Sequence, residues 1–188
     1  MPKLIYFDLQ GRAQAIRYLL AYKGVQFEDV RMSFEEWGAA KAAGTYGEGV
    51  QLPLYVDDAG MQFSQSKAIL EYLALEHNVT PANNKEAYEV MWAGETRVDH
   101  DKPEGMAGLF QENAPAEVID VCVENMNKLM TKYNTRWADG RAHVAGATLT
   151  AADFGLLTAY TSIIANPNLR NPVVSERMKT HYETLEHV

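Results

Sequence analysis

The sequence contains one cysteine, Cys122, among 188 residues. A single cysteine excludes an internal disulfide and leaves no set of thiolates for a structural zinc site. The apolar runs are only a few residues long, far short of the ~20 residues that cross a bilayer. Residues 1–9 lack the apolar segment of a secretory signal. These absences predict a soluble, cytoplasmic protein that does not bind membranes.

Basic residues are also few: 17 Lys and Arg stand against 25 Asp and Glu, for a net charge of −8. Such a chain repels a phosphate backbone, which argues against a nucleic-acid partner. Apolar residues make up 47% and charged residues 22%, close to the average of globular proteins, so the chain can bury a core. Its length allows one or two compact domains.

The first part of the chain mixes strand and helix patterns. Residues 3–8 are rich in Ile, Tyr and Phe, which favours a strand. Apolar side chains then recur at helical spacing over residues 12–23, and residues 25–32 alternate like a second strand. Two strands joined by a helix of this length are expected to run parallel, with a right-handed crossover.

A hairpin and a further helix follow. Residues 33–43 predict a helix or an irregular segment, and the glycine-rich residues 44–49 predict a loop. Residues 54–56 and 61–63 flank Asp57-Asp58-Ala59-Gly60, a sequence typical of a tight turn between antiparallel strands. Helical spacing then resumes, so the predicted order is βαβ, an irregular piece, ββ and α.

Residues 78–84 form a predicted linker, and the chain beyond them has helical patterns, with helices expected over 86–101 and 116–138. The sequence therefore predicts an α/β domain over 1–77 and an all-α domain over 84–188.

Two sets of polar residues in this sequence predict structure rather than chemistry. The segment Thr150-Ala151-Ala152-Asp153 resembles a helix capping box with Asp in the fourth place. The five histidines show no spacing of metal ligands and are predicted to lie on the surface, so no metal site is expected. They are His77, His100, His143, His181 and His187.

Tyr6 lies late in the first strand, shortly before the turn at Gly11 and Arg12. Open α/β sheets bind ligands at the carboxyl ends of their strands, where a phenol can donate a hydrogen bond to a developing anion. The alternative is a core tyrosine with a satisfied hydroxyl. Arg12 begins the following helix, and its alternative is an ordinary exposed charge.

Two further segments are suited to holding a peptide. Leu52–Pro53, preceded by Gln51, leads into the hairpin. A cis bond there would turn the Leu52 amide and carbonyl outward. The alternative is a plain proline at the start of a strand. Gln65 and Ser66 open the last helix of the α/β part, and a helix N-terminus attracts a carboxylate. From the sequence alone, simple helix capping is the favoured role of these two residues.

In this order, the segments resemble the cytosolic glutathione transferases, especially the tyrosine-type sigma, mu and pi classes. The similarity extends over nearly the whole chain and rests on residues 4–7, 11–18, 51–53, 65–66 and 149–154. The resemblance implies a thioredoxin-like N-terminal domain, a helical C-terminal domain, a homodimer, and glutathione as co-substrate.

The resemblance also implies roles for single residues. Tyr6 would be the catalytic hydroxyl beside the glutathione sulfur, and Arg12 would support that site electrostatically. Glutathione binding would involve Trp37, Lys41, Gln51, Leu52, Pro53, Gln65, Ser66 and Asp99.

Within that set, each part of the tripeptide has its own residues. Trp37 and Lys41 would hold the glycine end. Gln51 and the Leu52 backbone would fix the cysteinyl unit, with Pro53 cis.

The γ-glutamyl end would be held by residues from two subunits. Gln65 and Ser66 would take its carboxylate. Asp99 would reach its amine in the partner subunit, with Asp101 as a near neighbour in the alignment.

The implied function is conjugation of glutathione to small hydrophobic electrophiles, as in detoxification. The helical domain would contribute the electrophile pocket, including Met106 and Phe110. Two alternatives stay open: a non-catalytic scaffold like the lens crystallins or translation-factor relatives, and a glutathione-dependent isomerase of the prostaglandin-synthase type. Tyr46 is either an aromatic key inserted into the other subunit or an exposed loop residue. The resemblance leads us to expect further residues beyond Val188.

Overall fold

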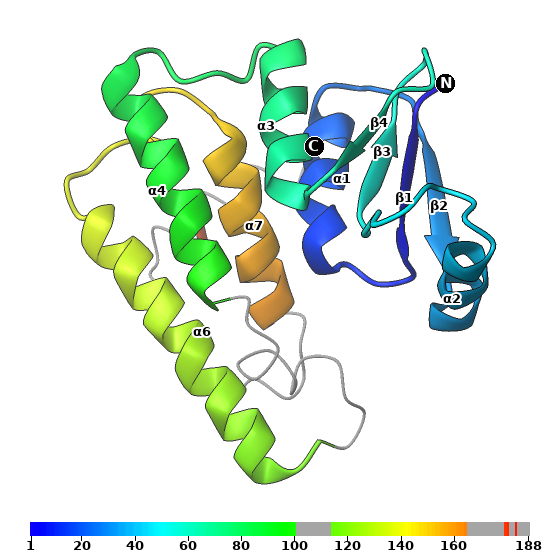
Figure 1. Ribbon diagram of the computed structural model, residues 1–188. Helices are drawn as coiled ribbons and strands as arrows, with labels where there is room; N and C mark the ends of the chain where they lie inside the picture. Colours follow the sequence, from blue (N-terminus) through cyan, green and yellow to red (C-terminus); the bar gives the residue numbers. More distant parts are fainter. Residues whose placement is uncertain (101–113, 165–178, 181–182, 184–188) are drawn as a thin grey trace. The chain divides into compact units, whose positions relative to one another are not determined.

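The computed structural model describes residues 1–100, 114–164, 179, 180 and 183 (Figure 1). The chain divides into two compact units, Met1–Asn78 and Val79–Val188. Within the described residues, no helix combines the length and apolar character needed to cross a bilayer.

The first unit contains a mixed sheet with the strand order β2-β1-β3-β4. Its strands are β1 (Lys3–Phe7), β2 (Glu28–Met32), β3 (Leu54–Val56) and β4 (Gln62–Ser64). Strands β1 and β2 run parallel, and β3 runs antiparallel to both β1 and β4. The predicted parallel pair and the predicted hairpin are both confirmed.

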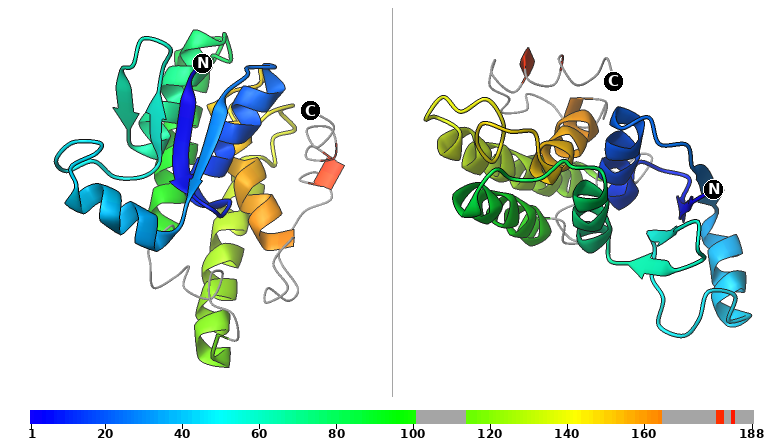
Figure 2. Two further views of the ribbon diagram at one scale, coloured as in Figure 1. Left: turned by 90° about the vertical axis from the view of Figure 1, so that its right-hand side faces the viewer. Right: turned by 90° about the horizontal axis from the view of Figure 1, so that it is seen from above.

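Three α-helices accompany this sheet. A 3₁₀ turn, Gly11–Ala13, leads into α1 (Gln14–Tyr22); α2 (Phe34–Ala42) follows β2, and α3 (Ser66–Glu76) follows β4. Figure 2 shows α1 and α3 side by side on one face of the sheet, with α2 away from that face. The core between the sheet and these two helices contains the fully buried Leu4, Ile16, Leu19, Leu20, Leu54, Ile69 and Leu73.

Helix α2 is stabilised by local hydrogen bonds at its N-terminus, which its apolar pattern does not show. The Ser33 hydroxyl accepts a hydrogen bond from the Glu36 N–H (3.1 Å), and the Glu36 carboxylate accepts one from the Ser33 N–H (2.6 Å). These two bonds form a complete capping box, and the Ser33 N–H lowers the pKa of Glu36. Since α2 buries none of its residues, it has no apolar stripe, which is why residues 33–43 gave only a weak helical pattern.

The β3–β4 turn depends on Asp57 and Gly60. The Asp57 carboxylate accepts hydrogen bonds from the Ala59 N–H (2.9 Å) and the Met61 N–H (2.8 Å). Gly60 has a φ of 84°, which glycine adopts at little cost. The turn residues identified in the sequence therefore act as expected.

The second unit is helical in its described part, with α4 (Asn84–His100), α6 (Ala116–Arg136) and α7 (Ala151–Ile164). Helix α4 packs against both α6 and α7. The helices predicted over 86–101 and 116–138 are confirmed, with small differences at their ends.

A partly buried ion pair links α4 to α6. Both carboxylate oxygens of Glu89 accept hydrogen bonds from the Arg136 guanidinium, each at 2.7 Å. That guanidinium also lies 4.5 Å from the centre of the Trp92 ring. A bidentate pair with a cation–π contact fixes one geometry between the two helices.

The segment that resembled a capping box begins α7, but only half of the box forms. The Asp153 carboxylate accepts hydrogen bonds from the Thr150 N–H (2.8 Å) and from the Val144 N–H (3.0 Å). The Thr150 hydroxyl donates to that carboxylate (3.1 Å), so it does not act as the accepting cap. Asp153 is fully buried and joins the start of α7 to the preceding loop.

Two histidines contradict the prediction of surface positions. His100 is only 6% exposed, and its Nδ1 lies 2.8 Å from the Asn125 side-chain oxygen. His143 is partly buried with its Nδ1 3.4 Å from the Asp153 carboxylate, which raises its pKa. Their partners come from other segments, so sequence spacing did not reveal them. His181 and His187 lie outside the described residues.

We predict that Asp153→Ala lowers the free energy of unfolding by about 3 kcal/mol, because two buried N–H groups lose their acceptor. Urea denaturation followed by circular dichroism measures this loss. Asp120→Ala, at an exposed position on α6, is the control and should change stability by less than about 0.5 kcal/mol. Equal stability of the two variants would contradict the structural role of Asp153.

Candidate functional site

The register of the sheet brings predicted site residues, which lie in or next to three strands, to the same end of the sheet. This end is called the sheet edge below. Ile5 of β1 pairs with Leu54 of β3, and Leu54 pairs with Ser64 of β4. These three residues form a row across the sheet near the carboxyl end of β1. The residues next to this row along the chain are Tyr6, Pro53 and Gln65.

The Tyr6 hydroxyl is held at the turn that follows β1. Its oxygen accepts a hydrogen bond from the backbone N–H of Arg12 at 3.2 Å, while its ring is buried. Among the described residues the hydroxyl has no other hydrogen-bond partner. Since a hydroxyl can donate one bond and accept two, the Tyr6 proton is not taken up by any described residue.

Gly11 makes the close approach of this turn possible. It has a φ of 41°, and a Cβ at this position would lie 2.7 Å from the Tyr6 hydroxyl oxygen and 2.5 Å from a Leu9 methyl group. A side chain at Gly11 therefore conflicts both with the backbone conformation and with the position of the hydroxyl.

The Leu52–Pro53 peptide bond is cis, as the family resemblance implied. Pro53 is buried, Leu52 is half-buried, and Gln51 is exposed. The segment thus begins at the surface and enters the sheet at β3.

The start of α3 differs from the simple cap that the sequence favoured. Gln65 makes no side-chain hydrogen bond to the helix, so that interpretation of Gln65 is wrong. Its backbone has a φ of 73°, in the left-handed region that non-glycine residues seldom adopt. Residues held in such conformations cluster at ligand sites, where the surrounding structure imposes them. The first amides of α3, from Ser66 onward, have no acceptor within the helix.

Trp37 and Lys41 lie one turn apart on α2, so their side chains share one side of the helix. Trp37 is half-buried against Tyr46, with ring centres 5.8 Å apart. Lys41 is exposed in the last turn. Tyr46 therefore contacts an aromatic residue of its own unit and is not a fully exposed loop residue.

Asp99 is an exposed residue of α4 in the second unit, and its role stays a prediction. Asp101, Met106 and Phe110 lie outside the described residues.

One residue near the site was missed by the sequence analysis. Arg17 is 7% exposed, and its guanidinium donates to the carbonyls of Leu9 (3.0 Å) and Gln10 (3.3 Å) in the turn after β1. It also pairs with Asp29 of β2 at 3.1 Å. Burial lowers the pKa of Arg17, and Asp29 acts in the opposite direction. The sequence did contain a signal for this burial: Arg17 follows Ile16 and lies on the apolar side of the predicted helix.

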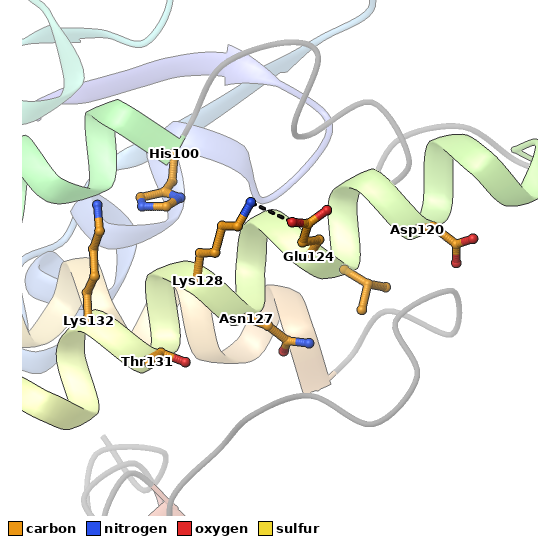
Figure 3. A pocket seen from close by; sticks show the side chains of 8 residues that line it. His100, Asp120, Glu124, Asn127, Lys128, Thr131 and Lys132 are labelled. Atoms are coloured by element: carbon orange, nitrogen blue, oxygen red, sulfur yellow. Dashed lines mark ion pairs between the residues drawn. The ribbon is translucent and has the colours of Figure 1, made fainter.

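The second unit has a groove of about 650 Å³ beside α6, which Figure 3 shows. It is lined by His100 and by side chains of both charges, with Lys128 paired to Glu124 at 2.6 Å. None of the predicted site residues lines it. In the described part of the chain, no group of three His, Cys, Asp or Glu side chains is arranged to hold a metal ion.

Comparisons with known proteins show the family of this chain. The family model described as the N-terminal domain of glutathione S-transferase matches residues 2–75. Glutathione S-transferase 4 of Caenorhabditis elegans is 40% identical over 177 residues, which cover 87% of this chain and 81% of that protein. The chain belongs to the glutathione S-transferase family.

Two further proteins extend the likeness. The crystal structure of the glutathione S-transferase from Ascaris lumbricoides has a TM-score of 0.80 at 26% identity, covering 100% of this chain and 92% of that one. Human hematopoietic prostaglandin D synthase is 29% identical over 168 residues, covering 89% of this chain and 82% of that protein. The predicted fold class, a thioredoxin-like α/β part followed by helices, is confirmed.

We predict that Gly11→Ala lowers kcat/KM for glutathione conjugation by about tenfold, because the new methyl group displaces the Tyr6 hydroxyl. Steady-state kinetics with chlorodinitrobenzene measure this loss. Gly60→Ala is the matched control: its φ is also positive, at 84°, but the space around it is open. This control should lose about 1 kcal/mol of stability and keep its activity. Equal activity in both variants would show that the close approach at Gly11 is unimportant.

Proposed function

We propose that the edge of the sheet at Tyr6, Leu52 and Ser66 binds glutathione, and that the chain transfers the glutathione thiolate to small hydrophobic electrophiles. One observation carries this proposal: the Tyr6 hydroxyl accepts from the Arg12 N–H, and no described residue accepts the hydroxyl proton. Family membership supports glutathione as the co-substrate.

The chemistry requires a thiolate, because the neutral thiol is a poor nucleophile. A free cysteine-type thiol has a pKa near ~8.5, so only a few per cent is ionised at neutral pH. A hydrogen bond donated to the sulfur favours its charged form. Lowering the thiol pKa by about two units corresponds to roughly 2.7 kcal/mol. Tyr6 supplies this hydrogen bond through its hydroxyl group.

The tripeptide is held by groups that fix where its sulfur lies. The backbone of Leu52, with Gln51 beside it, pairs with the cysteinyl unit. The first amides of α3 and the side chains of Gln65 and Ser66 take the γ-glutamyl carboxylate, because a helix N-terminus carries partial positive charge. Trp37 and Lys41 then bind the glycine end.

In the transfer step, the thiolate forms a carbon–sulfur bond with the electrophile. With an aryl halide, the halide departs with the electron pair of the broken bond, and the thiol proton has already been lost to solvent. Tyr6 keeps its proton throughout, and Arg12 adds positive potential near the sulfur. Holding both reactants in place supplies the remaining rate enhancement.

Several finer assignments belong to the same proposal. The protein acts in detoxification in the cytoplasm as a homodimer, in which Asp99 reaches the γ-glutamyl amine bound to the partner subunit. The domain over 1–77 binds glutathione, and the helical domain over 84–188 supplies the electrophile pocket.

A second candidate function is glutathione-dependent isomerisation. The similarity to human hematopoietic prostaglandin D synthase favours it, since that relative matches over most of both chains. The same thiolate would attack a prostaglandin endoperoxide and be released again at the end of the reaction. Turnover of an endoperoxide with no net consumption of glutathione distinguishes this activity from conjugation.

We predict that Tyr6→Phe slows conjugation to chlorodinitrobenzene by about 100-fold, or ~2.7 kcal/mol, because the sulfur loses its donor. Glutathione should still bind, since the groups that hold the peptide are unchanged. Stopped-flow kinetics and calorimetry measure the two quantities separately. Turnover equal to that of the wild-type chain would remove Tyr6 from the mechanism. A wild-type chain that binds no glutathione at millimolar concentration would favour the scaffold alternative.

We predict that Ser66→Ala weakens glutathione binding by about tenfold while kcat changes by less than about twofold, because Ser66 holds the peptide and does not touch the reacting sulfur. Isothermal calorimetry gives the affinity. Ser64→Ala, at the exposed end of β4, is the matched control and should bind like the wild-type chain. An unchanged affinity in Ser66→Ala argues against carboxylate binding at α3.

A further inference from the structure

Arg17 occupies an unusual place for a charged residue. It lies on α1 at 7% exposure, among the residues that face the sheet. Enclosing a guanidinium costs free energy unless it is paired and hydrogen-bonded. Its hydrogen bonds reach Asp29 of β2 and the turn that connects β1 to α1.

The contacts of Arg17 are specific to its planar shape. Its Nη1 donates to the carbonyls of Leu9 (3.0 Å) and Gln10 (3.3 Å) and to the Gln14 side chain (3.3 Å). Its Nε lies 3.1 Å from both carboxylate oxygens of Asp29 on the neighbouring strand β2. The side chain thus connects β2 and α1 to the two residues that precede Gly11.

The same guanidinium lies beside the catalytic tyrosine. Its central carbon is 5.9 Å from the centre of the Tyr6 ring. Within the described residues, its Nη2 is buried and has no hydrogen-bond partner. The ring of Tyr6 therefore has the Arg17 cation on one side, and its hydroxyl has the Arg12 N–H at the turn.

Asp29 remains paired even without Arg17. Arg31 on the same strand donates to Asp29 at 2.8 Å and to Asp8 at 3.1 Å, and Arg31 is itself partly exposed. Removing Arg17 therefore does not leave a buried carboxylate alone. The loss of the contacts to Leu9 and Gln10 can be studied with less damage to the fold than a buried ion pair usually shows.

We propose that Arg17 is a positioning residue for the transferase reaction: it fixes the Leu9 and Gln10 carbonyls, and through them the turn that places the Tyr6 hydroxyl at the glutathione sulfur. Arg17 does not touch the tripeptide. It acts by keeping the Arg12 N–H within bonding distance of the Tyr6 oxygen. This inference rests on the proposed function.

Arginine is required at position 17 because several N–H groups of one side chain must donate hydrogen bonds at the same time. A lysine carries the same charge but has no planar fork, so it cannot bind Asp29 and both carbonyls in the same way. A displacement of the turn by a fraction of an ångström would aim the Tyr6 proton away from sulfur while leaving the peptide-binding groups in place.

The test compares Arg17→Met, Arg17→Lys and the control Arg31→Met in the full chain. The readouts are the apparent pKa of the bound glutathione thiol, from the thiolate absorbance across pH, and kcat and KM with chlorodinitrobenzene. For Arg17→Met we expect the bound thiol pKa to rise by about one unit and kcat at neutral pH to fall about tenfold, with KM for glutathione within about twofold. Arg17→Lys should recover part of the loss. Arg31→Met should leave the bound thiol pKa unchanged, because it touches neither carbonyl.

A double-mutant cycle shows whether Arg17 acts through Tyr6. In a Tyr6→Phe background, Arg17→Met should reduce kcat by less than about twofold further, since residues that act as one unit are not additive. A full tenfold loss in that background overturns the proposal, as does a wild-type thiol pKa in Arg17→Met. If Arg17→Met does not fold, Arg17→Lys decides: an unchanged bound thiol pKa overturns the proposal, and a raised one supports it.

These failures differ from a failure of the proposed function. A wild-type chain that binds glutathione without lowering its thiol pKa overturns the function of Tyr6, and the role of Arg17 with it. A wild-type chain that lowers the thiol pKa, together with an Arg17→Met variant that lowers it equally, overturns only the role of Arg17.

Discussion

The direction of one hydroxyl group is the constraint on which the proposed chemistry depends. The Arg12 N–H, at 3.2 Å, occupies a lone pair of the Tyr6 oxygen, and no described residue accepts the hydroxyl proton. Backbone amides are fixed by the fold, so this bond orients the hydroxyl without a mobile side chain. Gly11 is needed because a Cβ there would meet the hydroxyl. The turn after β1 therefore has to be both tight and rigid.

The turn after β1 is held in place from two sides. On the sheet side, Tyr6 belongs to a central strand with neighbours on both sides, and its ring is buried. On the helix side, Arg17 binds the carbonyls of Leu9 and Gln10 and pairs with Asp29. Apolar packing buries the Tyr6 ring but does little to fix its orientation. The hydrogen bonds of a guanidinium fix an angle as well as a distance. The site thus combines both kinds of interaction.

Local signals predicted most of the elements, and their failures have physical causes. The hairpin was predictable because Asp57 and Gly60 act within the turn itself. Helix α2 was uncertain because it buries no residue and depends on the Ser33–Glu36 capping box, which an apolar period does not reveal. His100 was placed on the surface because its partner, Asn125, is far away in the sequence.

The sequence by itself determined the types of residue available and their order along the chain: a tyrosine before a glycine turn, a proline before a hairpin, and Gln65-Ser66 before a helix. These are local properties, and they sufficed for the fold class and the family resemblance. Only the tertiary structure decided the register that puts Tyr6, Pro53 and Gln65 at one edge, and the left-handed backbone of Gln65. It also decided the burial of Arg17. Each of these depends on contacts between segments far apart in the chain, which no local pattern of side chains encodes.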